Sequence, residues 1–541
     1  MSSPTPDQNT FDAIVVGAGI AGMYQLYRMR EQGLKVKAFE AGTSVGGTWY
    51  WNRYPGARVD SQSEVYQYWF SEELLKEWDW PERFPAQPDV EKYLNHVADK
   101  FGLRKDIQFN TRVKSAHWNE STKRWAVTTD QGETYTAQFF MTCVGGLSAP
   151  LDPPFPGYKK FKGQTFHTAR WPKEPIDWKG KRVGVVGTAA TGIQVIQTIA
   201  PLVEQLTVFQ RTPNYIIPMH NPKYSDADRA AWKRKYGDLR NYVHNTFAGF
   251  GYDFQGKPWA EFTPEQRNEL LEKLWADGSL EFWVGGFVEV FFDPQINEEI
   301  SEWVRAKMRA RIKDPKKAEK LVPMSYGFGT RRVPLETRYL EAYNRDNVEI
   351  VDVNSEPIVE ITENGVKTST NASTKEYPMD ILVMAIGFDA GSGALTAMDI
   401  RGRGGRVLKD EWKKEIRTTM GLQIAGYPNL FTTMAPFAPA GAFCNMPTCL
   451  QQQVDWINDC VRYLHTHGKT TMEPTNETEE AWLKHHDEIA NTTLVVKTKS
   501  WYMGSNVEGK PPRLLSYLGV GTYRQKCEEV KAKGYEGFAL S

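Results

Sequence analysis

Three glycines near the N-terminus have the spacing of a nucleotide-binding turn. Gly17, Gly19 and Gly22 form G-x-G-x-x-G between the apolar run that starts at Phe11 and a stretch with helical periodicity. In this motif the first glycine permits a tight turn, the second lets the backbone approach a pyrophosphate, and the third brings helix against strand. Glu40 ends the next apolar run, where an acid accepts hydrogen bonds from ribose hydroxyls. The pattern predicts a dinucleotide site but does not distinguish FAD from NAD.

A second turn of the same kind lies about 170 residues further along the chain. It departs from the motif at its middle position, where alanine replaces glycine, a change that is tolerable if the φ angle stays negative. The strand that follows ends in Gln210, Arg211 and Thr212, with an arginine where an NAD site carries an acid. Arginine accommodates the 2′-phosphate of NADP. We therefore predict NADP binding through Arg211, Thr212 and the turn residues Gly187, Thr188, Ala189, Ala190, Thr191 and Gly192.

Two further stretches resemble the fingerprints of one enzyme family. FKGQTFHTARWP (161–172) is similar to the F-x-G-x-x-x-H-x-x-x-W-P motif of Baeyer–Villiger monooxygenases, and GGTWYWNRYPGARVD (46–60) resembles their companion G-G-x-W motif. The resemblance is to the class B flavin enzymes that act on cyclohexanone, cyclopentanone or phenylacetone. Related flavin monooxygenases that oxygenate N or S atoms have an aromatic residue in place of the Trp171-Pro172 pair.

The resemblance implies an activity and a set of catalytic residues. Such an enzyme holds FAD, takes hydride from NADPH and uses O2, through a C4a-peroxyflavin, to convert a ketone into an ester or lactone plus NADP⁺ and water. By resemblance, Arg332 stabilises the negative charge of the reacting groups, and Asp60 holds Arg332 by a hydrogen bond. Arg331 would reach the NADP 2′-phosphate, and His167 would couple the movement of two domains rather than perform chemistry.

The resemblance also implies further contacts with the cofactors and the substrate. Arg332 and Asp60 are expected beside the cofactors, and Trp501 is expected to contact NADP. Ala442 and Phe443 fall in the loop expected to shape an apolar substrate pocket. The remaining residues expected near FAD are Ile20, Ala21, Gly47, Thr48, Trp49, Tyr66, Val113 and Met446.

The elements that must position these residues predict an α/β fold with two Rossmann-like dinucleotide-binding domains, for FAD and NADP, and a helical insertion. Charged segments with helical periodicity between the second turn and residue 328 indicate the insertion. We expect an FAD domain at 1–145, completed by 381–541 with the substrate loop. The NADP domain is expected at 146–220 and 329–380, and the insertion at 221–328.

Composition limits the partners and the compartment. The 541 residues contain 66 Lys plus Arg and 66 Asp plus Glu, so no basic surface for nucleic acid or an anionic membrane is expected. The N-terminus lacks a signal-peptide pattern, and no apolar run approaches about 20 residues. We predict a cytoplasmic, monomeric protein with a small-molecule ketone and O2 as partners and no metal. The five cysteines include no C-x-x-C pair, which predicts reduced thiols.

Three alternatives differ in their chemistry. A disulfide reductase needs a redox cysteine pair beside the flavin, and the first βαβ unit contains no cysteine. A flavin monooxygenase of N or S atoms would use the same cofactors, but the Trp171-Pro172 pair argues against it. The alanine at position 189, where the motif has glycine, favours two further alternatives. These are an uncoupled NADPH oxidase that releases hydrogen peroxide and a flavoprotein without catalytic activity.

Overall fold

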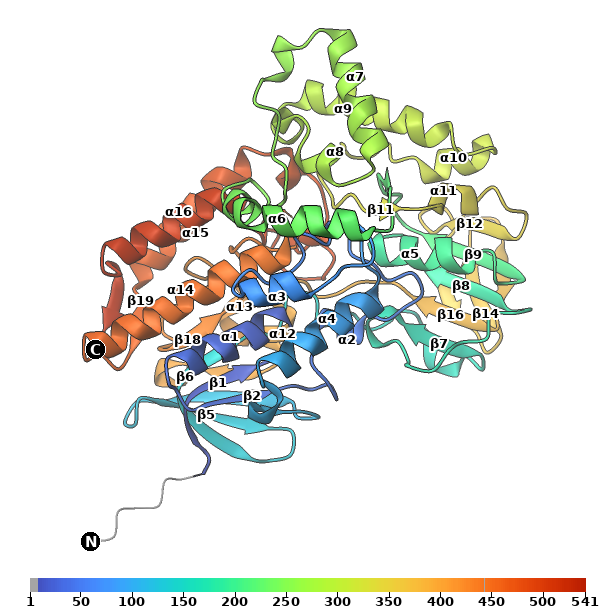
Figure 1. Cartoon of the computed structure of the whole chain (residues 1–541). Helices are drawn as coiled ribbons and strands as arrows, with labels where there is room; N and C mark the ends of the chain where they lie inside the picture. Colours follow the sequence, from blue (N-terminus) through green and yellow to red (C-terminus); the bar gives the residue numbers. More distant parts are fainter. Residues whose placement is uncertain (1–7, 442) are drawn as a thin grey trace.

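A computed structural model describes residues 8–441 and 443–541 of the chain. Figure 1 shows two β-sheets side by side, with a group of helices above them and the C-terminal helices at one flank. No helix of the described ranges is long and apolar enough to cross a membrane.

The larger sheet contains the first glycine turn. Its strands follow the order β17-β4-β5-β6-β1-β2-β3, and β18 also pairs with β6. Helix α1 (Ile20–Glu31) follows β1, and α14 (Met446–Thr466), from the far end of the chain, packs beside it. The apolar end of β1, AIVV, is buried, as is usual for a strand with parallel neighbours on both sides. The strands are β1 (Thr10–Val16), β2 (Val36–Phe39), β3 (Ile107–Gln108), β4 (Val113–Asn119), β5 (Arg124–Thr129), β6 (Thr134–Thr142), β17 (Asp399–Arg401) and β18 (Leu430–Thr432).

The second sheet has five strands, all paired in parallel, in the order β12-β9-β8-β16-β7. Helix α5 (Ala190–Ile199) follows β8 at the second glycine turn. The strands are β7 (Gln164–His167), β8 (Arg182–Val186), β9 (Gln205–Gln210), β12 (Val348–Asp352) and β16 (Ile381–Met384).

Strand β16 requires a correction to the boundary expected at residue 381. The run ILVM was expected to open the C-terminal part of the FAD domain, but it pairs with β8 and β7 in the second sheet. A short, wholly apolar strand is buried on both faces, which suits the centre of a parallel sheet. We therefore propose that the chain returns to the first domain after Met384.

The segment between the two halves of the second domain is helical. Its helices are α6 (Asp226–Val243), α7 (Pro264–Asp277), α8 (Glu281–Val284), α9 (Pro294–Arg309) and α10 (Pro315–Leu321). Helices α7, α8, α9 and α10 lie together at the top of Figure 1, and α6 lies below them near α3 (Glu72–Glu77). Capping boxes start α6 at Ser225 and α7 at Thr263. The chain enters and leaves the segment side by side, because β10 (Ile217–Pro218) pairs with β11 (Leu335–Glu336).

The remaining elements surround the two sheets. Strands β13 (Ile358–Ile361), β14 (Gly365–Ser369) and β15 (Thr374–Pro378) form an antiparallel sheet, and β19 (Met472–Pro474) pairs with β20 (Phe538–Leu540). The other helices are α2 (Thr48–Trp51), α3 (Glu72–Glu77), α4 (Gln87–Lys100), α11 (Tyr339–Ala342), α12 (Gly393–Thr396), α13 (Leu408–Trp412), α15 (Asn476–Asn491) and α16 (Val520–Ala532).

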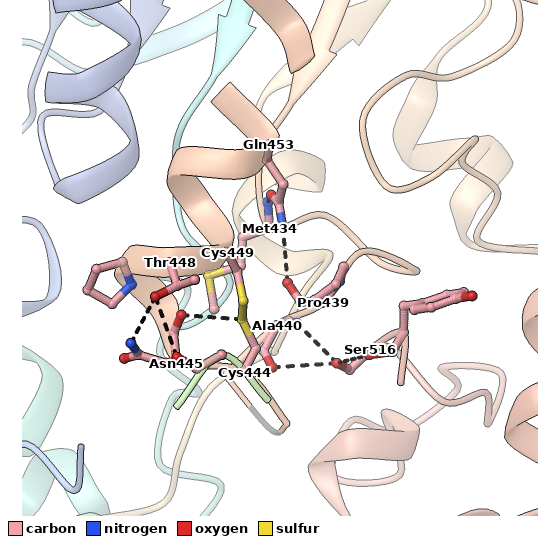
Figure 2. Close-up of a disulfide and its surroundings, with 12 residues drawn as sticks. Met434, Pro439, Ala440, Cys444, Asn445, Thr448, Cys449, Gln453 and Ser516 are labelled. Carbon is pink, nitrogen blue, oxygen red and sulfur yellow. Dashed lines mark hydrogen bonds between the residues drawn. A yellow bond between two sulfur atoms is a disulfide. The ribbon is translucent and has the colours of Figure 1, made fainter. Parts of the chain in front are cut away.

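The cysteines differ from expectation at one place. A disulfide joins Cys444 and Cys449 at the start of α14, as Figure 2 shows, so the prediction that all five thiols are reduced is wrong for this pair. The loop end and the first helical turn bring the two Cα atoms to 6.5 Å, within the range that a disulfide spans. The C-x-x-C criterion did not cover this wider spacing. Cys143, Cys460 and Cys527 are free and buried.

Candidate active site

The first glycine turn joins β1 to α1 in a conformation that side chains would block. Gly17 has a φ of +100°, and a Cβ atom there would lie 2.5 Å from the carbonyl oxygen of Cys143. Gly19 caps α1, and Ile20 and Ala21 are its first residues, so the free backbone N–H groups of the first turn point out of the sheet edge. A Cβ on Gly22 would collide with the backbone oxygen of Gly17. The turn therefore leaves a cradle for a pyrophosphate.

The segment after residue 45 covers this cradle. A Cβ atom on Gly47 would lie 2.8 Å from the Cα of Gly19, so the two backbones are nearly in contact. Thr48 and Trp49 begin the short helix α2, and the Trp49 indole donates a hydrogen bond to the Tyr66 hydroxyl at 3.0 Å. Both aromatic side chains are buried.

Glu40 lies at the C-terminal end of β2 beside the turn. Its carboxylate accepts hydrogen bonds from the backbone N–H groups of Ala18 (2.8 Å) and Gly42 (2.7 Å). The backbone of Glu40 also accepts from Thr111 N–H at 3.0 Å, which places Val113, the first residue of β4, close by. The carboxylate thus stabilises the turn by accepting two backbone hydrogen bonds. Its remaining lone pairs could accept hydrogen bonds from ribose hydroxyls.

The second glycine turn repeats the first with one substitution. Gly187 has a φ of +106°, and Cβ atoms on Gly187 and Gly192 would collide with backbone oxygens as in the first turn. Ala189 caps α5 with φ −76° and ψ −176°, close to the −83° and −164° of Gly19. The methyl group of Ala189 is therefore accommodated without strain.

Neighbouring polar groups hold this second turn. Thr188 is buried, and its hydroxyl donates to the Thr212 carbonyl oxygen at 3.1 Å. The Asn214 side chain donates to the Thr188 carbonyl oxygen at 2.9 Å. Ala190 and Thr191 begin α5, so their N–H groups belong to its unpaired first turn.

Two arginines lie together beyond the end of β9. Arg211 is exposed, whereas the Arg331 guanidinium carbon lies 4.5 Å from the centre of the Tyr326 ring. Burial lowers the pKa of Arg331 below its usual range, and the positive charge of Arg211 lowers it further. The Arg331 Nε atom is buried with no hydrogen-bond partner among the described residues. Two close cations with free donors suit a phosphate group.

Asp60 and Arg332 form an ion pair between the two domains. The Arg332 Nη2 atom donates to the Asp60 Oδ2 atom at 2.7 Å, and the Asp60 side chain is only 3% exposed. Burial raises the pKa of the Asp60 carboxyl above its usual range, against the opposing effect of Arg332. Burial acts to lower the pKa of the Arg332 guanidinium, but the Asp60 carboxylate more than compensates and raises it. Arg332 therefore keeps its positive charge.

The two fingerprint segments contact the second domain. In segment 46–60, the Tyr54 hydroxyl donates to the Gln194 side-chain oxygen at 2.9 Å, and the Gln194 amide donates to the Arg58 carbonyl oxygen at 3.0 Å. A Cβ atom on Gly56 would lie 2.5 Å from the Gln194 carbonyl oxygen, so the loop rests directly on α5. This packing explains why the motif contains a glycine at this position.

The other fingerprint lies at the edge of the second sheet. His167 ends β7, and its Nδ1 atom accepts from the Ala169 N–H at 3.1 Å. Its Nε2 atom is 3.0 Å from the Leu151 carbonyl oxygen, so this nitrogen carries the proton. Burial lowers the pKa of His167, which keeps the ring neutral. Trp171 is buried, 5.2 Å from the Phe166 ring.

The substrate loop expected from the sequence packs against the insertion. The Phe443 ring is 1% exposed and lies 5.6 Å from the rings of both Trp283 and Phe291. Sequence reasoning missed these two residues because nothing marks them among the many aromatics of the insertion. Ala442 lies outside the described residues. Pro439 and Ala440, which precede it, are bound to Gln453 and Ser516 (Figure 2).

A small, partly open pocket lies beside this loop. Trp501 and Tyr502 line it together with Gly146, Met434 and Gly441. Met446, the first residue of α14, is near Gly441. Tyr502 was not singled out from the sequence, although it directly follows Trp501 in a motif that was.

Comparisons with known proteins agree on one class of enzyme. A family profile described as flavin-binding monooxygenase-like matches residues 12–246. An acetone monooxygenase (methyl acetate-forming) of Gordonia sp. (strain TY-5) is 55% identical, over 98% of this chain and 99% of the relative. A Baeyer-Villiger monooxygenase of Pseudooceanicola batsensis is 40% identical over 97% of this chain and 95% of its own.

Two further similarities concern the cofactors and the reaction type. The crystal structure of OTEMO in complex with FAD and NADP is 38% identical and superposes with a TM-score of 0.94 over 98% of this chain and 99% of that one. A phenazine N-monooxygenase of Lysobacter antibioticus is 40% identical over 99% of this chain and 98% of its own.

Proposed function

The chain belongs to the Baeyer–Villiger monooxygenase family, and from this premise we propose that it oxidises ketones to esters or lactones with O2 and NADPH. One observation supports the proposal most directly, the ion pair of the buried Asp60 carboxylate with Arg332 between the two glycine-turn domains. A guanidinium fixed in this way supplies a positive charge where negative charge develops during oxygen transfer. Asp60 and Arg332 are thus the proposed catalytic pair.

The residues of both turns fit the two cofactors. The cradle of Gly17, Gly19 and Gly22 would hold the FAD pyrophosphate, with Glu40 at the adenosine ribose. The Gly187 turn would hold NADP, with Arg211 and Arg331 at the 2′-phosphate. When bound, the flavin accepts hydride from NADPH and activates O2. The protein residues bind these groups, exclude water and hold the charge of Arg332 in place.

The ketone would bind beside Phe443. This ring is almost fully buried against Trp283 and Phe291, so it gives the loop an apolar support. The 55% identical relative is named for acetone. We therefore propose short-chain ketones as substrates. We also propose that the protein works as a monomer in the cytoplasm.

The test is an assay of purified, FAD-loaded protein with NADPH and a panel of ketones. We expect NADPH consumption to rise with acetone, with one methyl acetate formed per NADPH. Arg332→Ala should lower ester formation by about 100-fold or more while FAD remains bound. Arg234→Ala, an exposed arginine of α6, is the matched control.

Two results would contradict the proposal. Hydrogen peroxide as the sole oxygen product with every ketone would indicate an NADPH oxidase. N- or S-oxides without esters would indicate heteroatom oxygenation, the alternative to which the phenazine relative points.

A further inference from the structure

Two buried tyrosines, Tyr66 and Tyr502, and the half-buried Tyr54 lie close enough to the Arg332 guanidinium for its charge to act on their hydroxyls. Two of their hydroxyls have protein partners, since Tyr54 donates to Gln194 and Tyr66 accepts from Trp49. The Tyr502 hydroxyl has no partner among the described residues, although the residue is only 1% exposed. A buried hydroxyl without a partner is rare in folded proteins and requires an explanation.

Tyr502 lies between the substrate loop and the proposed NADP contact. Its ring centre is 5.2 Å from that of Phe443 and 4.4 Å from that of Trp501. The residue also lines the small pocket beside Gly441 and Met434. Tyr502 therefore borders the region where a small ketone would bind, and its buried hydroxyl has no protein partner there.

The backbone of this segment is anchored on both sides. The Leu515 N–H donates to the Tyr502 carbonyl oxygen at 2.8 Å. The Thr498 hydroxyl donates to the Thr330 hydroxyl at 2.9 Å, which ties the segment to the residue directly before Arg331 and Arg332. Anchored backbone on both sides limits the positions that the Tyr502 ring can adopt relative to Arg332.

We propose that the Tyr502 hydroxyl is a second hydrogen-bond donor, beside the Arg332 guanidinium, to the carbonyl oxygen of the ketone. The inference rests on the proposed function. Attack at the carbonyl carbon moves the C=O π electrons onto that oxygen, which then accepts stronger hydrogen bonds than the ground-state ketone. When one carbon substituent migrates with its electron pair to the attacking oxygen, its C–C bond and the O–O bond of the oxidant break, and the outgoing oxygen leaves with the O–O electron pair. The C=O bond then re-forms and the hydrogen bonds weaken again.

Tyr502 is suited to donate throughout the working pH range. Burial raises the pKa of its hydroxyl well above the usual range, although the charge of Arg332 acts in the opposite direction. The neutral hydroxyl has one proton and no competing acceptor among the described side chains. A ketone oxygen would satisfy this donor and remove the cost of leaving it unpaired.

The test compares Tyr502→Phe with Tyr535→Phe in the FAD-loaded enzyme. Tyr535 is the control because its hydroxyl is also buried, beside the Cys460 thiol, and it packs on Trp456 and Tyr463, away from the site. We expect Tyr502→Phe to lower kcat/KM for acetone by about 100-fold. The anaerobic rate of flavin reduction by NADPH should stay unchanged, and the peroxide released per NADPH should rise.

Wild-type kcat/KM in Tyr502→Phe would overturn the inference, as would an equal slowing of flavin reduction and ester formation. If Tyr502→Phe does not retain FAD, 3,5-difluorotyrosine at position 502 gives the second test. Its more acidic hydroxyl should move the alkaline limb of kcat/KM for acetone to lower pH, and an unchanged profile would contradict the proposal. A wild-type enzyme that makes no ester would instead refute the proposed function itself.

Discussion

At the scale of single residues, the arginines proposed to bind phosphate differ in their surroundings from the arginine proposed to act on the ketone. Arg331 and Arg211 are close enough to lower the pKa of Arg331, and they lack carboxylate partners among the described ion pairs. Arg332, the next residue, instead forms an ion pair with the Asp60 carboxylate at 2.7 Å. Adjacent arginines thus have different electrostatic surroundings, which suits one for a phosphate ligand and the other for a transient charge.

This difference predicts cofactor selectivity. Arg211→Ala should raise the KM for NADPH about tenfold, since a hydrogen bond to a charged group contributes about 1.5 kcal/mol. The KM for NADH, which has no 2′-phosphate, should stay unchanged. Steady-state kinetics with both cofactors would check this, with Arg234→Ala as control. An equal rise in both KM values would show that Arg211 acts on the fold rather than on the phosphate.

At the scale of elements, the 46–60 segment joins the two domains. It covers the first glycine turn at Gly47 and packs on α5 at Gly56. Its last residue, Asp60, forms the ion pair with Arg332. The hydrogen bonds of Gln194 to Tyr54 and Arg58 fix the same helix to the segment. A single loop therefore connects both glycine turns and Arg332.

Close packing at this joint leads to a stability prediction. Gly56→Ala should lower the free energy of unfolding by about 1–3 kcal/mol, because the added methyl group would meet the Gln194 carbonyl oxygen. Gly33→Ala is the matched control, since both glycines have positive φ angles but a Cβ atom on Gly33 would have no neighbour within 4 Å. Denaturant titration of both variants measures the difference. Equal losses would mean that backbone strain alone is responsible.

At the scale of the whole molecule, the C-terminal part of the chain closes the site. After β16 the chain returns to the first sheet through β17 and β18, supplies α14 beside α1, and then forms the segment that carries Trp501 and Tyr502, which α16 and β20 follow. His486 of α15 is hydrogen-bonded to this segment, because its Nε2 atom is 2.8 Å from the Leu514 carbonyl oxygen. Burial lowers the pKa of His486 from 6.5 to about 4, so its ring is neutral in the folded protein.

The buried histidine makes stability depend on pH. Its pKa is lower in the folded state, so its contribution is complete above pH 6.5 and is lost as the pH falls from 6.5 towards 4. This loss amounts to about 3 kcal/mol. His486→Gln, which can still donate to Leu514, should unfold with a weaker dependence on pH in that range. Denaturant titrations between pH 4.5 and 7.5 test this, and identical slopes for both proteins would contradict it.

Local sequence patterns by themselves determined much of this protein. Glycine spacing, the acid at Glu40, Arg211 and the two fingerprints predicted the nucleotide turns and the family, because turn geometry depends on residues within a few positions of one another. The similarity to known proteins confirmed the family and the α/β fold. The roles of the individual site residues stay predictions, which the proposed variants test.

Other properties depend on residues that meet only in the folded chain. Asp60 and Arg332 are 272 positions apart, and no local pattern sets their 2.7 Å contact. The tertiary structure also decided that Ala189 keeps a negative φ angle, that β16 lies in the second sheet and that Cys444 pairs with Cys449. The missing partner of Tyr502 is likewise visible only once all its neighbours are in place, because hydrogen bonding and burial are set by long-range packing.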